Sequence, residues 1–106
     1  MQSKMINLIE KTRANGVFFI SGDVHYGELS VQKTKNLYPI YDLTSSGITQ
    51  VWDFDTDNKF RIRQAFHPNH YGLILIDWKA QKISLQLKDV EQKIVLQKNI
   101  SFKKLE

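Results

Sequence analysis

The feature that most constrains the fold of this chain is the alternation of apolar and polar residues over its last third. Three segments, 71–78, 82–88 and 93–102, alternate in this way and are separated by short polar turns. A period of two is typical of β-strands, and short connections pair successive strands in antiparallel order. The pattern therefore predicts a C-terminal antiparallel meander. Both faces of the first strand carry apolar residues, so we expect it to be covered on both sides.

The N-terminal part of the chain shows other patterns. Apolar residues recur at helical spacing over 4–14, and Asn15-Gly16 is a common helix end, so we expect a helix there. The continuous apolar run 17–21 favours a strand that is buried on both faces, and 38–44 favours a second inner strand. Helix, turn and buried strand together are typical of an α/β protein.

The middle of the chain offers no point of division. Segment 48–52 is expected to form a short helix or turn, and 53–59 a polar surface loop. There is no repeat and no long linker, and 42% hydrophobic and 25% charged residues are ordinary for a globular protein. We therefore predict a single domain over 1–106, of α/β or α+β class. So short a chain is stable only if its elements close around one core.

Composition excludes several kinds of protein. The chain has no cysteine, so disulfides and thiolate zinc sites are excluded. Apolar runs such as 72–76 are far shorter than the roughly 20 residues that cross a bilayer, and the first 15 residues are not signal-like. We expect a soluble chain with no membrane partner. The net charge of +4 is scattered and forms no aromatic and basic platform, so no nucleic-acid partner is expected.

The segment with the most chemical information is FISGDVHYGELS, residues 19–30. A strand runs into Gly22 and is followed by Asp23 and His25, whose carboxylate and imidazole are suitable ligands for zinc, iron or manganese. Extended backbone would point both side chains the same way, about 7 Å apart, which permits a pair of ions roughly 3.5–4 Å apart. The residues alone favour a structural interpretation, in which Asp23 caps a turn and His25 is a hydrogen-bonded surface residue.

Four further residues are candidates for supporting roles. Glu28 could be a hydrogen-bond partner of the His25 imidazole or an ordinary strand-face carboxylate. Tyr26 could line a phosphate cleft or cover the sheet edge. Ser45 and Ser46 could offer hydroxyl or backbone N–H groups to a phosphate, although a Ser-Ser-Gly turn needs no ligand to explain it.

Two further polar features have competing explanations. His67 and His70 resemble a ligand pair, but the proline between them predicts a loop, and loop histidines are the simpler account. Asp42 lies within an apolar strand, where a buried carboxylate needs a partner. Candidates for that partner are Arg61 and Arg63.

Three blocks in order, SGDVHYGELS, YPIYDLTSSGIT and HYGLILIDW, resemble the closing part of the PhoD-like (alkaline phosphatase D) family, a branch of the calcineurin-like metallophosphoesterases. The similarity covers about residues 16–78. It implies the C-terminal portion of a metallophosphatase sandwich, in which two facing sheets are flanked by helices.

The resemblance also implies a metal site and an activity. The family's Gly-Asp-x-His motif matches Gly22 to His25, so Asp23 and His25 are the implied ligands, one to each ion of a binuclear Fe, Ca, Zn or Mn centre. Such ions polarise a phosphoryl oxygen and lower the pKa of bound water towards about 7. The implied function is metal-dependent hydrolysis of phosphate mono- or diesters. No residue is assigned as catalytic beyond these ligands.

The family's upstream Asp-containing and Asn-His motifs are not found before residue 16. We therefore expect an incomplete metal site and a fragment that is inactive alone, whose missing ligands come from an N-terminal segment or from a homo-oligomer. The family is often exported or periplasmic, but no export signal is found here, so the location stays open. The alternative is a noncatalytic β-rich interaction module or remnant, which self-associates through an exposed sheet edge without metal.

Overall fold

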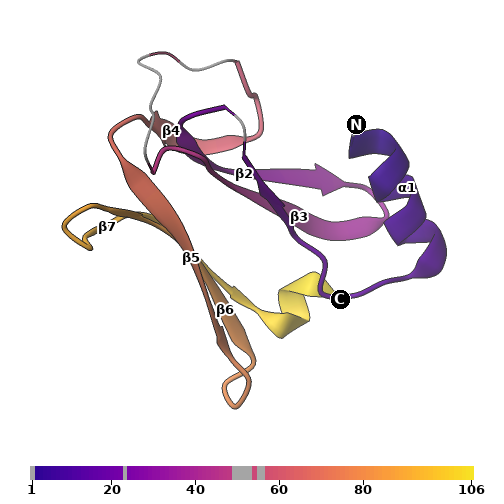
Figure 1. The fold of residues 1–106 in the computed structure, drawn as a ribbon. Helices are drawn as coiled ribbons and strands as arrows, with labels where there is room; N and C mark the ends of the chain where they lie inside the picture. The colour runs from indigo at the N-terminus through magenta and orange to yellow at the C-terminus, as the bar shows by residue number, and fades with distance from the viewer. Residues whose placement is uncertain (1, 23, 49–53, 55–56) are drawn as a thin grey trace.

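The computed structural model of the protein describes residues 2–22, 24–48, 54 and 57–106. Within this part of the chain there are one α-helix, seven strands and a final 3-10 turn, so the fold is α+β with mostly β content, as predicted (Figure 1). The elements are α1 (Gln2–Thr12), β1 (Phe19–Ser21), β2 (Gly27–Thr34), β3 (Leu37–Ser45), β4 (Arg61–Phe66), β5 (His70–Asp77), β6 (Lys82–Asp89), β7 (Ile94–Ser101) and η1 (Phe102–Leu105).

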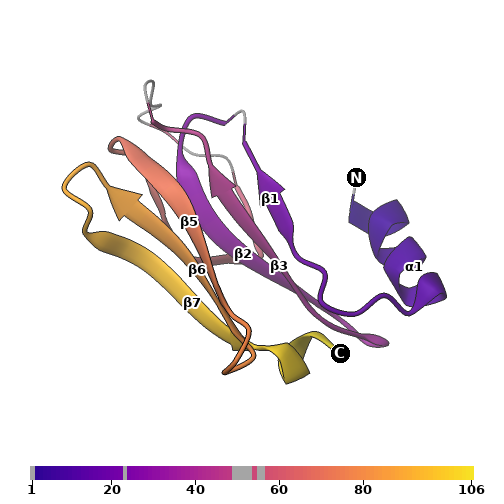
Figure 2. The same cartoon turned by 60° about the horizontal axis from the view of Figure 1, so that its bottom comes forward.

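The strands form two sheets that face each other as two layers (Figure 2). The first sheet has the order β1-β3-β2-β4, with β1 parallel to β3 and the other pairs antiparallel. The second sheet has the order β5-β6-β7 and is antiparallel throughout. The helix α1 lies beside the β1–β3 side of the first sheet.

The core lies between the two sheets and takes side chains from both. Leu85 and Leu87 of the central strand β6 are 0% exposed, and they cluster with Leu29 and Leu43 of the first sheet. Each fully buried leucine contributes about 1.5–3 kcal/mol of hydrophobic stabilisation. This packing confirms the predicted C-terminal meander, and it also confirms β3 as an inner strand, because β3 lies between β1 and β2.

The predicted N-terminal helix is present and ends two residues before the expected position. Arg13 takes the left-handed conformation with a φ of 56°, and the Ala14 N–H donates to the Ile9 carbonyl over 3.3 Å. This is the hydrogen bond of a Schellman C-cap, which satisfies carbonyls at the helix end. The N–H of Gly16 then donates to the Leu105 carbonyl over 2.7 Å and fastens the following turn to the chain's other end.

A tyrosine hydroxyl joins this turn to the first sheet. The Tyr38 O–H donates to the Ala14 carbonyl over 2.6 Å and accepts from the Val17 N–H over 3.2 Å. Tyr38 is itself only 9% exposed. Because the turn leads directly into β1, these hydrogen bonds help to fix where β1 begins beside β3. None of the helices in the described part of the chain is long and apolar enough to cross a membrane.

Two predictions about strand burial are wrong. The strand expected over 17–21 is shorter and more exposed than predicted. Strand β1 has only three residues, it lies at the edge of its sheet, and its Ile20 is 69% exposed. Strand β5 is not covered on both faces, because Leu75 on one face is 50% exposed and Ile76 on the other is 42% exposed. Apolar composition led to the wrong prediction because it does not show which strands lie at the edge of a sheet, where no neighbouring strand shields the side chains.

Strands β2 and β4 were not predicted. The residues Gly27, Glu28, Leu29 and Ser30 of β2 are all buried, so this strand shows no alternation that a sequence pattern could reveal. In β4, Arg63 has a left-handed φ of 61°, so the backbone of this strand is locally irregular. Residues 49–52 of the expected helix or turn, and residues 53, 55 and 56 of the expected loop, lie outside the described residues.

Candidate metal-binding loop

The predicted ligand loop and the Ser-Ser-Gly turn lie side by side. Strands β1 and β3 are parallel, with Ser21 paired to Thr44, so both strands end at the same edge of the sheet. The segment 22–26 follows β1, and Ser45-Ser46-Gly47 completes β3 and the turn after it. A Cβ placed on Gly22 would lie 3.5 Å from Oγ of Ser46. Two segments more than 20 residues apart in sequence are thereby brought into contact.

His25 does not have the extended backbone that the sequence interpretation assumed. Its φ is 57°, in the left-handed region that histidine enters more readily than most non-glycine residues. The chain bends over 24–26 to enter β2, and this bend produces the difference. The expectation that Asp23 and His25 point the same way from extended backbone is therefore wrong at His25. The position of Asp23, the other predicted ligand, lies outside the described residues.

Another histidine, His70, packs beneath the same loops. His70 opens β5 and is 1% exposed, and its Nδ1 lies 2.8 Å from the Pro68 carbonyl, which fits a neutral ring that donates from Nδ1. Its ring lies between Gly27 and Gly47, where any Cβ would come 2.8 Å from a ring nitrogen. Within the described residues Nε2 has no hydrogen-bond partner. The loop interpretation of His70 is therefore wrong, since this histidine is a buried part of the fold.

The backbone around His70 completes the junction. The N–H of His70 donates to the Gly47 carbonyl over 3.2 Å, and the Asn69 side-chain amide donates to the carbonyls of Gly47 and Ile48, each over 3.2 Å. The segment before β5 therefore holds the turn after β3. Sequence reasoning missed this role, because Gly27, Gly47 and His70 are far apart in the sequence and only the fold brings them together.

Tyr26 is part of this packing. It is 1% exposed, and its ring lies 5.6 Å from the ring of His67 at an interplanar angle of 50°. Of the two interpretations of Tyr26, a covering and packing role agrees better with this burial than a place on an open phosphate cleft. His67 approaches the loop through this contact and comes from the segment that carries His70.

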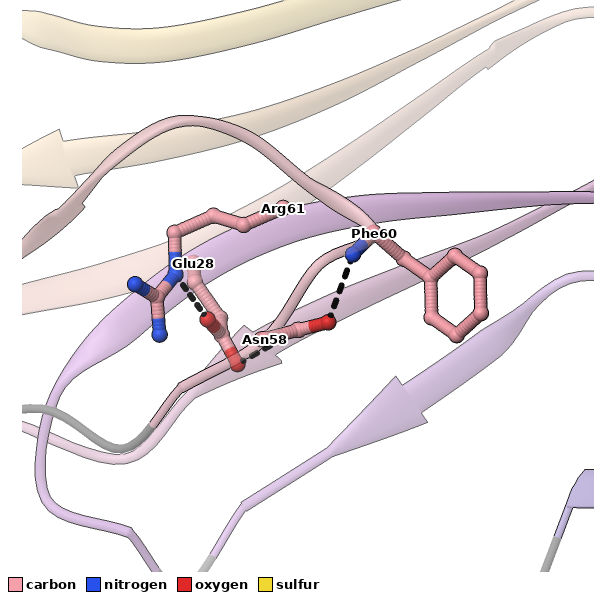
Figure 3. Close-up of polar contacts among 4 residues, drawn as sticks. All are labelled: Glu28, Asn58, Phe60 and Arg61. Carbon is pink, nitrogen blue, oxygen red and sulfur yellow. Dashed lines mark hydrogen bonds and ion pairs between the residues drawn. The ribbon is translucent and has the colours of Figure 1, made fainter.

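Glu28 is held in an ion pair on the first sheet (Figure 3). Its Oε2 lies 2.5 Å from Nε of Arg61, and its Oε1 accepts from the Asn58 side-chain amide over 3.2 Å. Asn58 in turn accepts from the Phe60 N–H over 3.0 Å. The recorded partners of Glu28 are thus structural, and the pairing joins β2 to the segment that enters β4. Because Glu28 is 7% exposed, losing its cation would leave a buried charge.

Asp42 has a different partner from the one predicted. The Ser21 hydroxyl donates to Oδ1 of Asp42 over 2.8 Å, whereas Arg61 pairs with Glu28. Burial raises the pKa of the Asp42 carboxyl above its usual value, the Ser21 hydrogen bond opposes this rise, and the charge of Glu28 adds to it. The hydroxyl joins β1 to β3 next to the candidate loop.

The described residues do not bring three metal donors together. No group of three His, Asp or Glu side chains in the described part of the chain could hold a metal ion. Asp23 and His25 together would supply two donors, whereas zinc takes about four ligands and calcium six to eight. Asp23 and two further carboxylates, Asp53 and Asp55, lie outside the described residues, so the incomplete binuclear centre stays a prediction.

Comparisons with protein-family models, with curated proteins and with solved structures give no match for this chain. Membership of the PhoD-like family stays a prediction that rests on the three sequence blocks.

Proposed function

We propose that this chain supplies one ligand-bearing loop to a metal-dependent phosphoesterase of PhoD-like type, which hydrolyses phosphate mono- or diesters. The supporting observation is that Gly22, which opens the predicted ligand loop, lies beside Ser46 at the carboxyl ends of two parallel strands. This is the position at which α/β proteins commonly build their binding sites.

In this proposal Asp23 and His25 are the metal donors, and Ser46 lies beside the loop where a hydroxyl can reach a phosphoryl oxygen. Metal ions bound there would polarise the ester and activate a water molecule. Beneath the loop, the buried His70 ring and its bond to Pro68 fix the spacing of the glycines on either side. The other donors have to come from a further segment or chain, so the chain by itself is expected to bind metal weakly and to hydrolyse nothing.

Equilibrium dialysis against Mn²⁺ and Zn²⁺ tests the proposal. Asp23→Ala and His25→Ala are each expected to weaken metal binding at least about tenfold, since even outer partners of metal ligands contribute that much. Glu10→Ala, which removes a carboxylate from α1, is the matched control and should leave metal affinity unchanged. If the two loop variants bind metal as the wild-type chain does, the proposed ligands are wrong. Turnover of a phosphodiester by the chain alone would contradict its incompleteness.

A second function, that of a noncatalytic module that self-associates, is favoured by one specific observation. Strand β5 lies at the edge of its sheet with exposed apolar side chains, and within the described residues its one strand neighbour is β6. Sedimentation in the presence of EDTA, together with the dialysis experiment above, separates the two functions. A metal-free dimer supports the module, and a monomer that binds metal through Asp23 and His25 supports the phosphoesterase part.

A further inference from the structure

The edges of the two sheets differ in how they are protected against pairing with another chain. Four strands of the described part are edges: β1, β4, β5 and β7. Natural proteins protect exposed edges by short strands, charged side chains and bulges. Strand β1 has only three residues, and β4 carries Arg61 and Arg63 with a register shift in its pairing to β2. Strand β7 carries Lys98, and its pairing with β6 is also shifted, between Leu87 and Lys88.

Strand β5 has none of these protections. It is eight residues long, it contains no lysine, arginine or proline, and its pairing with β6 runs without a shift. Its first N–H is bound to Gly47, and the outer side of the strand has no other strand neighbour in the described structure. Leu75 is 50% exposed and Ile76 42%, and Trp78 just beyond the strand is 74% exposed. Asp77, at the end of the strand, is its only formal charge.

The space beside this edge is apolar as well. A hollow of about 470 Å³ lies between β5 and β1, and it is lined by Ile20, Leu43, Leu73 and Ile74 together with small residues. Further along β5, a second hollow of about 340 Å³ is bordered by Phe18, Ile76 and Trp78, among others. Apolar surface therefore accompanies the open hydrogen-bonding edge along most of its length. Exposed apolar surface next to an unpaired strand is typical of an association site.

We infer that β5 is the contact surface of a homodimer, in which it pairs in antiparallel order with β5 of a second copy. The product is one continuous six-stranded sheet, β7-β6-β5-β5-β6-β7, around a two-fold axis perpendicular to the sheet. This inference rests on the second proposed function, self-association, and does not depend on metal binding. It names the strand, the partner and the symmetry.

Among the long edge strands of the described structure, charge allows self-pairing at β5 and opposes it at β4 and β7, so a second copy fits this edge. Each chain carries a net charge of +4, so self-pairing requires an edge on which like charges do not meet. An axis at Leu73, near the middle of β5, pairs residues 71–75 of the two copies, with Tyr71 opposite Leu75. This register opposes no two charged residues and leaves out His70, whose N–H is bound to Gly47. Self-pairing of β7 would instead bring Lys98 of the two copies together, and self-pairing of β4 would bring their arginines together. A two-fold contact also uses the same patch on both copies, as the commonest homodimers do.

Sedimentation equilibrium of the wild-type chain and two charge variants tests the inference. Leu75→Lys places a cation on the pairing edge of each copy and is expected to raise the dimer dissociation constant at least about tenfold. Asn99→Lys adds the same charge at an exposed position of β7 and should leave the constant within about twofold. Circular dichroism of both variants verifies that the sheets remain folded.

Cross-linking tests the register, because the chain contains no cysteine. Residues opposite each other in an antiparallel pair have Cα atoms about 4.5–5.5 Å apart, within the range of a disulfide. Leu73→Cys is therefore expected to form a covalent dimer on mild oxidation, and Lys98→Cys is not. A wild-type chain that stays monomeric overturns both self-association and the β5 contact. A dimer that is insensitive to Leu75→Lys, or that cross-links through position 98, overturns the β5 assignment while leaving self-association intact.

Discussion

Replacing Gly47 by alanine tests the packing under the candidate loop. The added Cβ would overlap the His70 ring and lie 2.8 Å from its Nδ1. The ring has little room to move, because it is 1% exposed, its Nδ1 is bound to the Pro68 carbonyl, and Gly27 lies against its other side. Overpacking of a filled site costs about 1–3 kcal/mol. With the ring fixed on both sides, we expect a cost of about 2–3 kcal/mol from the upper part of that range.

Urea unfolding followed by circular dichroism measures this cost, and a thermal scan should show a fall in Tm of about 8–20 °C. Gly22→Ala is the matched control, because its Cβ would make an ordinary contact of 3.5 Å with Ser46. We expect that variant to stay within about 0.5 kcal/mol of the wild type.

A double-mutant cycle identifies the cause. In a His70→Ala background the ring is absent, so Gly47→Ala should lose most of its cost, which gives a coupling energy within the roughly 0.5–3 kcal/mol range of contacting residues. The reasoning is refuted if Gly47→Ala costs less than about 0.5 kcal/mol in the wild-type background, or if it costs the same with and without His70.

Three further substitutions give separate tests. Tyr38→Phe removes the hydroxyl between the helix end and β3 and should destabilise the chain by about 1–2 kcal/mol in urea unfolding; no change would mean that these hydrogen bonds are replaced by water. Arg61→Ala leaves the Glu28 carboxylate buried without its cation and should cost about 3 kcal/mol, whereas Glu28→Gln keeps a hydrogen-bonding group and should cost less; the reverse order would contradict the buried-charge account. Burial raises the pKa of Asp42 above the ordinary value of 3.8, so between these two pKa values the native state keeps a proton that the unfolded chain releases. The fold is therefore destabilised increasingly as the pH rises from 3.8 to the raised pKa. Asp42→Asn should therefore gain stability relative to the wild type at pH 7 and little at pH 3, and unfolding at the two pH values would contradict this if the gain did not grow with pH.

Much of the fold could be predicted because its elements follow simple patterns. The helix and the three C-terminal strands each have a clear period, and β3 combines aromatic and branched residues. Strand β2 could not be predicted because its buried residues include Glu28, which is compatible with burial only through its pairing with Arg61. Such a partner is 33 residues away and leaves no local signal.

The candidate site could be predicted only in part. The Gly-Asp-x-His motif located the loop, but the bend at His25 and the burial of His70 depend on how the second sheet packs against the first. The exposure of Ile20 likewise depends on which strand has no neighbour. Sequence patterns describe one element at a time, and these features are properties of pairs of elements.

NMR spectroscopy with paramagnetic Mn²⁺ tests the proposed metal-binding loop most directly. At substoichiometric Mn²⁺, we expect the resonances of His25, Val24 and Ser46 to broaden first, and Asp23→Ala and His25→Ala to abolish this selective broadening. If the resonances of an acidic turn elsewhere, such as Asp89 to Glu91, broaden first, or if broadening is uniform and unchanged in the two variants, the loop is not a metal site and the phosphoesterase proposal is wrong.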